Sequence, residues 1–176
     1  RTGLARLTVT GRIVLATSNG TGMGHLARQS SVALALGAEA GPTIFSLSTA
    51  VHVVEEHGIA AEYCPSHQRG WIPHARWHRY LRDRVSALLD ETDAKVLVFD
   101  GVAPYLGLVR ARAAHPDVAF VWVRRGMWRR DANRRLLSGA DFFDLVVEPG
   151  EFARAADRGP TASAPAVRLS PISLTS

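Results

Sequence analysis

The sequence predicts an α/β protein: a Rossmann-like parallel β-sheet with helices on both faces. Short apolar runs alternate with amphipathic stretches along most of the chain. One run, at 95–99 (KVLVF), is continuously apolar after its first residue, as in a strand buried on both faces. A glycine-rich turn directly follows the first apolar run and leads into the first amphipathic stretch. Strands and helices that alternate at this spacing form βαβ units, and therefore a parallel sheet.

Each expected strand is a short apolar or β-branched run that ends at a glycine, a proline or a polar turn. In chain order, the expected strands are 13–16, 43–47, 62–64, 95–99, 118–123, 145–147 and 167–169. Between the last two lies 158–165 (RGPTASAP), whose composition predicts a mobile loop rich in turns.

Each expected helix has apolar residues at intervals of three and four, or ends at a glycine. In chain order, the expected helices are 26–36, 49–57, 71–90, 104–114 and 132–137. The third has the strongest period, with Trp77, Leu81, Val85, Leu88 and Leu89 on one face and arginines between them.

The length of 176 residues predicts one domain. We expect a short tail at 1–11, the domain at 12–172, and the start of an interdomain linker or a C-terminal tail at 173–176. Cys64 is the only cysteine, which excludes an internal disulfide. No apolar run approaches the length of a membrane span, so we expect a cytoplasmic protein with at most peripheral membrane contact.

The charge pattern favours local recognition of anions. The formal net charge is +5, and stretches 69–84 and 110–135 carry the basic excess. No zinc-finger, basic-zipper or RNP-like pattern accompanies them, so we expect no nucleic-acid partner. Lys95 is the only lysine, which excludes a phosphate loop ending in G-K-[ST].

The turn after the first strand is the main candidate site. Gly20, Thr21, Gly22 and Gly24 permit close backbone approach, so their amides can face a phosphate at the helix N-terminus. His25 follows, where a histidine can act as a general base. The spacing is not the dinucleotide fingerprint G-x-G-x-x-G, and no acidic residue ends the second strand. A nicotinamide dehydrogenase is therefore disfavoured.

Segment 13–36 (IVLATSNGTGMGHLARQSSVALAL) resembles the N-terminal motif of GT-B glycosyltransferases of family 28, which includes the peptidoglycan lipid-intermediate N-acetylglucosaminyltransferase. That family has a G-G-T-G-G-H core, and this chain, with G-T-G-M-G-H at 20–25, has one residue more between Gly-Thr-Gly and the histidine. The resemblance implies one of two Rossmann-like domains, the one that receives the acceptor. It implies a nucleotide-sugar donor as substrate, no cofactor or metal in this domain, and a C-terminal donor-binding domain or partner subunit.

Further candidates follow later strands, where ligands bind in such sheets. Asp100 can take a proton from an acceptor hydroxyl. Arg124 and Arg125 can hold an anionic acceptor, and Glu148 is a further binding candidate.

Two other chemistries are disfavoured. His74 and His78 have the spacing of metal ligands but lack the glutamate of the H-E-x-x-H motif. Ser18, Asp100 and His115 have the order of a hydrolase triad, but an elbow serine leads directly into its helix and Ser18 does not.

The sequence thus predicts a glycosyltransferase N-terminal domain, inactive alone, that binds a sugar or lipid-linked acceptor. Two alternatives stay open: a noncatalytic acceptor-binding subunit of a split glycosyltransferase, and a stand-alone nucleotide- or anion-binding module. Binding of nucleotide by the isolated chain distinguishes the last from the others.

Overall fold

The computed structural model describes residues 12–18 and 23–172. The expected tail at 1–11, the expected linker at 173–176, and Gly20, Thr21 and Gly22 lie outside the described residues. Among the described residues, no helix is both long and apolar enough to cross a membrane.

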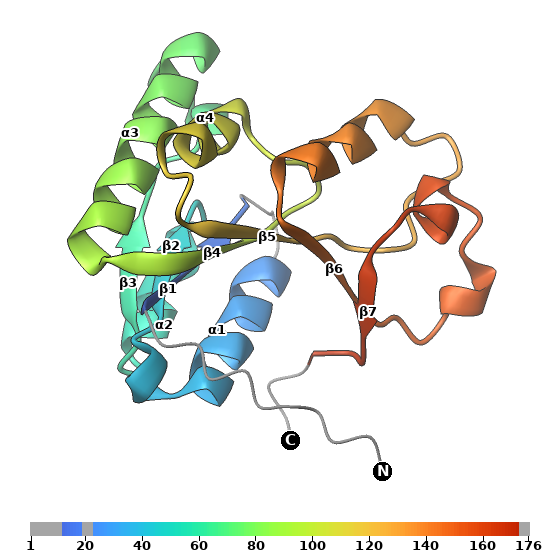
Figure 1. Ribbon diagram of the computed structural model, residues 1–176, viewed down its shortest axis with the longest axis horizontal. Helices are drawn as coiled ribbons and strands as arrows, with labels where there is room; N and C mark the ends of the chain where they lie inside the picture. The colour runs from blue at the N-terminus through green and yellow to red at the C-terminus, as the bar shows by residue number, and fades with distance from the viewer. Residues whose placement is uncertain (1–11, 19–22, 173–176) are drawn as a thin grey trace.

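A seven-stranded sheet forms the centre of the fold (Figure 1), and every neighbouring pair of strands is parallel. Its spatial order is β3-β2-β1-β4-β5-β6-β7, so the chain moves outward in one direction from β1 to β3 and in the other from β4 to β7. The strands are β1 (Arg12–Thr17), β2 (Thr43–Ser46), β3 (Ala60–Tyr63), β4 (Ala94–Asp100), β5 (Ala119–Val123), β6 (Leu145–Pro149) and β7 (Val167–Leu169). The prediction of an α/β Rossmann-like parallel sheet is therefore confirmed.

Helices cover both faces of this sheet (Figure 1). The α-helices are α1 (Gly24–Leu36), α2 (His52–Glu55), α3 (His74–Thr92) and α4 (Leu106–Ala114). The 3₁₀ helices are η1 (Ala38–Ala40), η2 (Thr49–Val51), η3 (His67–Arg69), η4 (Arg134–Phe142), η5 (Arg154–Ala156) and η6 (Pro160–Ser163). Helices α1 and α2 lie on one face, and α3 and α4 on the other, as expected when crossovers of one hand run in opposite directions.

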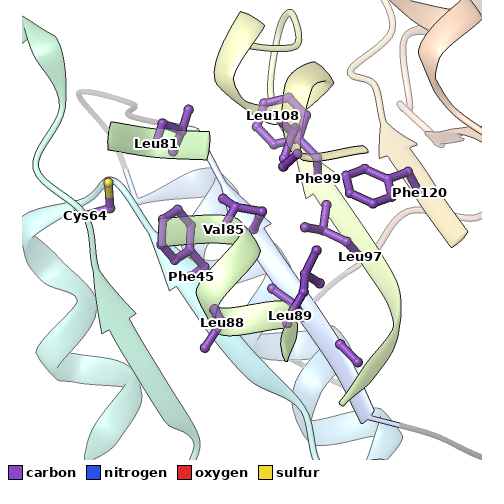
Figure 2. Close-up of a cluster of buried hydrophobic side chains, with 14 of the residues drawn as sticks. Phe45, Cys64, Leu81, Val85, Leu88, Leu89, Leu97, Phe99, Leu108 and Phe120 are labelled. Atoms are coloured by element: carbon purple, nitrogen blue, oxygen red, sulfur yellow. The ribbon is translucent and has the colours of Figure 1, made fainter. Parts of the chain in front are cut away.

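The two faces have separate hydrophobic cores because successive residues of β1 point to opposite sides. Ile13 and Leu15 pack with Leu26 of α1, and Val14 and Ala16 belong to the larger core beneath α3. Figure 2 shows part of this larger core, where α3 turns its apolar stripe toward β4 and the sheet. The residues that predicted α3 from their spacing are all buried: Trp77, Leu81, Val85, Leu88 and Leu89.

Two expectations about connections are corrected by the structure. The expected short helix at 132–137 is present, but as the 3₁₀ helix η4, which starts at Arg134, runs to Phe142 and packs Gly139 against Pro104 and Trp122. The expected mobile loop 158–165 is folded against the sheet and contains η6. Thr161 in it is fully buried; its hydroxyl donates to Asp157 Oδ2 and accepts from the backbone N–H of Trp128. Tertiary hydrogen bonds therefore order a segment whose composition predicts a loop.

Candidate active site

The site lies where β1 and β4 end side by side. Thr17 and Asp100 are partners in the β1–β4 register, and the N–H of Ser18 donates to the carbonyl of Asp100 over 2.8 Å. The chain then leaves β1 toward α1, whose first turn contains His25. This edge is the carboxyl end of the parallel strands, where ligands bind in open α/β sheets.

Asp100 and His25 are in direct contact, so the structure brings two of the predicted site residues together. Asp100 is fully buried, and its Oδ1 lies 2.7 Å from Nδ1 of His25. The His25 side chain is 19% exposed, and within the described chain its Nε2 has no hydrogen-bond partner. A carboxylate only accepts hydrogen bonds, so this contact assigns the proton to Nδ1 and the lone pair to Nε2.

Arg28 is the third member of this cluster, and the sequence reasoning missed it. Its Nη1 lies 3.0 Å from both carboxylate oxygens of Asp100. Arg28 is three residues after His25 in α1, so the two side chains share one face of the helix. That spacing is the one signal in the sequence that could have led to Arg28.

Gly101 is a second residue that the sequence reasoning missed. A Cβ at this position would lie 2.4 Å from Phe99 Cζ and 2.9 Å from Ser18 Cβ. Its carbonyl accepts the indole N–H of the buried Trp122 over 2.8 Å. Glycine therefore lets β4 turn tightly against the end of β1 directly after Asp100.

Arg124 and Glu148 also come together, but with each other and inside the protein. Arg124 is 1% exposed, and its Nη2 lies 3.2 Å from Glu148 Oε2. The same nitrogen lies 3.5 Å from the carbonyl of Ala164 and 3.3 Å from that of Pro165, so it fastens the segment before β7 to the ends of β5 and β6. Direct binding of a ligand by Arg124 or Glu148 stays a prediction.

Arg125 points the other way and is exposed, with only a loose 3.6 Å contact between its Nε and Glu151 Oε1. It lines an open groove of about 570 Å³ at the carboxyl edge of the sheet. Apolar side chains of Val102, Met127 and Leu136 form much of this groove, and Arg129 also borders it. Val102 is two residues after Asp100, but His25, Arg28 and Asp100 themselves do not line this groove.

A larger groove, about 610 Å³, lies between η4 and the segment before β7. Arg124 forms part of its wall, but neither His25 nor Asp100 does. It is therefore separate from the cluster of His25, Asp100 and Arg28.

The remaining titratable candidates lie elsewhere. His115 ends α4 and faces Asp90, at 3.7 Å, so it forms no triad with Ser18 and Asp100. Burial raises the pKa of the Cys64 thiol to about 12, which keeps it protonated and inert. In residues 12–18 and 23–172, no group of three or more His, Cys, Asp or Glu side chains is placed to hold a metal ion.

Solved structures of sugar-nucleotide enzymes share this fold. MurG from Acinetobacter baumannii aligns with a TM-score of 0.61 at 13% identity, over 90% of this chain and 44% of MurG. A glycosyltransferase from Rickettsia africae aligns with a TM-score of 0.58 at 12% identity, over 78% of this chain and 36% of the enzyme. UDP-GlcNAc 2-epimerase from Methanocaldococcus jannaschii aligns with a TM-score of 0.54 at 13% identity, over 82% of this chain and 41% of the epimerase.

The chain therefore has the Rossmann-like fold of one half of a GT-B protein, and it spans less than half the length of these three neighbours. No protein-family model matches the sequence, and no curated protein does.

Proposed function

We propose that this chain is the acceptor-binding half of a GT-B glycosyltransferase that resembles family 28. The complete enzyme would move a sugar from a nucleotide diphosphate sugar to an acceptor hydroxyl. The observation that carries the proposal is the His25–Asp100 pair at the carboxyl edge of a GT-B half. The pair supplies a positioned base with an available nitrogen, which is what activation of a hydroxyl needs.

In the proposed reaction, Nε2 of His25 takes the proton of the acceptor hydroxyl. The acceptor oxygen attacks the anomeric carbon and forms the new glycosidic bond. The bond from that carbon to the diphosphate oxygen breaks, and the nucleoside diphosphate leaves with the electron pair. Asp100 stabilises the imidazolium that His25 becomes, because its buried carboxylate lies 2.7 Å from Nδ1.

The groove lined by Val102 and Arg125 is the proposed acceptor site. Its wall combines apolar Val102, Met127 and Leu136 with the guanidinium groups of Arg125 and Arg129. These groups suit an acceptor that carries both an apolar part and an anionic group, since guanidinium pairs well with phosphate or carboxylate. Gly24 and the predicted loop residues Gly20, Thr21 and Gly22 would face the diphosphate. This proposal is supported by the first turn of α1, where no side chain caps the backbone N–H groups and no acidic residue would repel an anion.

Calorimetric titration of the chain with UDP and with UDP-sugars tests the assignment to the acceptor half. Weak or no binding is expected, because the donor would be held mainly by a C-terminal domain or partner subunit. Tight one-to-one binding would overturn the proposal and favour the stand-alone nucleotide-binding module. A noncatalytic acceptor subunit would bind acceptor and partner normally, and replacement of His25 would then leave transfer unchanged.

A further inference from the structure

We propose that Arg28 is a positioning residue: it holds Asp100 as an ionised, acceptor-only carboxylate, and thereby keeps Nε2 of His25 free of a proton. The role of Arg28 in transfer rests on the proposed function. Its effect on the His25 ring does not, because it concerns the protonation of two side chains in the free chain.

The contacts show why Asp100 needs a cation. Its side chain is fully buried, and a carboxylate removed from water is costly unless it is paired and hydrogen-bonded. Arg28 Nη1 lies 3.0 Å from both oxygens, and guanidinium is always charged. His25 is the other side chain in contact with this carboxylate in the described chain, so a neutral His25 contributes a hydrogen bond but no charge.

The two α1 side chains contact Asp100 in different ways. Arg28 supplies the positive charge, and the histidine donates its Nδ1–H to Oδ1. In the described chain, the charged groups in contact around His25 are therefore Asp100 from β4 and, through it, Arg28 from α1.

Loss of the Arg28 charge leaves two ways to compensate Asp100, and both place a proton on Nε2. Either His25 becomes an imidazolium beside an ionised Asp100, or Asp100 takes a proton and donates it to Nδ1, which moves the ring proton to Nε2. A base with a proton on Nε2 cannot accept one from a hydroxyl.

Two-bond ¹H–¹⁵N spectra of the histidine rings in the labelled 176-residue chain test this directly, with no substrate. The His25 signals are identified by their loss in His25→Gln. In the wild-type chain near pH 8 we expect a proton on Nδ1 and none on Nε2. In Arg28→Gln, Nε2 should be protonated at that pH. Arg28→Lys should restore the wild-type spectrum, because it keeps a cation.

Asp100→Asn is the second variant, because an asparagine amide can donate to Nδ1 and should also move the proton to Nε2. Arg82→Gln is the matched control: Arg82 pairs with Asp83 on the exposed side of α3, and its loss should change nothing at His25. Circular dichroism confirms that each variant is folded. If Arg28→Gln does not fold, the wild-type spectrum and Arg28→Lys still decide the result.

A wild-type ring that carries its neutral proton on Nε2 would overturn the proposal. So would a folded Arg28→Gln with an unchanged His25 ring. In a transfer assay, Arg28→Gln should lower kcat about 10–100-fold with little change in KM, as for other residues that orient a functional side chain. A rise in KM alone with an unchanged ring would mean that Arg28 binds substrate instead. Failure to detect transfer would count against the proposed function and leave the spectroscopic result intact.

Discussion

Nδ1 of His25 and Oδ1 of Asp100 lie 2.7 Å apart, although 75 positions separate the two residues. They meet because β1 and β4 are neighbours in the sheet, with Thr17 paired to Asp100, and because α1 starts just beyond β1. The crossover through β2, β3 and α3 returns the chain to the opposite side of β1. The pair therefore depends on the topology of the whole sheet.

Gly101→Ala should disturb this junction. The added methyl group would lie 2.4 Å from Phe99 Cζ and 2.9 Å from Ser18 Cβ, and neither neighbour is at a free surface. Overpacking of this kind costs about 1–3 kcal/mol of the free energy of unfolding. Urea denaturation measures the loss. Gly24→Ala is the control and should keep wild-type stability, because a Cβ there meets nothing within 4 Å.

Leu97→Ala should be strongly destabilising. Leu97 is fully buried in the core between the sheet and α3, which Figure 2 shows. Removal of its methyl groups leaves a cavity, with an expected cost of about 2–5 kcal/mol. Leu34→Ala on α1 makes the same chemical change at a side chain that is 51% exposed and should cost less than about 0.5 kcal/mol. Equal losses in the two variants would contradict the assigned core.

Arg124→Ala should cost about 3 kcal/mol or more of the free energy of unfolding, because it leaves the buried carboxylate of Glu148 without its main partner. Arg125→Ala, one residue further, should leave the stability within about 0.5 kcal/mol of wild type because its side chain is 62% exposed. The roles should reverse in acceptor binding, where Arg125→Ala should raise the acceptor KM. An Arg124→Ala protein of wild-type stability would show that the buried ion pair is unimportant for folding.

The chain should lose stability as the pH falls below about 6.5, the ordinary histidine value. Burial and the nearby His74 lower the pKa of His67, and burial with His74, His67 and Arg110 lowers the pKa of His78. The unfolded chain therefore binds protons first on acidification, which shifts the equilibrium toward unfolding. Above that pH, both histidines are neutral in the folded and the unfolded chain, so they do not make the free energy of unfolding depend on pH.

Urea midpoints at pH 7.5 and pH 5.5 measure this effect. His74→Gln should reduce the acid-induced loss, because the His74 ring centroid lies 4.6 Å from that of His67 and 4.4 Å from that of His78. His57→Gln, at an exposed position before β3, should leave the loss unchanged. If His74→Gln loses as much stability as the wild type, His74 does not contribute to the acid-induced loss.

Local patterns in the sequence were sufficient for the sheet. Each strand is an apolar run bounded by turn residues, and the seven runs became seven strands with ends shifted by a few residues. The period of Trp77, Leu81 and Val85 placed α3 correctly, although the helix begins after Pro73 and not at 71. Segments without such a pattern were predicted less well. In η4, contacts of Gly139 with Pro104 and Trp122 decide the conformation, and these are tertiary.

The sequence predicted those site residues whose place follows from their position relative to the strand ends. Asp100 ends β4, and His25 lies in the first turn of the helix that follows β1, so their proximity at the carboxyl edge could be expected from the topology. Arg28 was missed because its spacing from His25 shows only that the two share a helix face, and gives no sign of the contact with Asp100. The burial of Arg124 could not be read from the sequence either, since Arg125 beside it is exposed and the two differ only in which side of the chain they face.

A sugar-transfer assay of His25→Ala tests most directly whether His25 is the base. It uses a labelled nucleotide sugar and the proposed two-part enzyme, this chain together with a donor-binding half. Turnover should fall about 10²–10⁴-fold, while circular dichroism shows the fold retained and His57→Ala keeps the wild-type rate. An unchanged rate in a folded His25→Ala protein would contradict the assignment of His25 as the base.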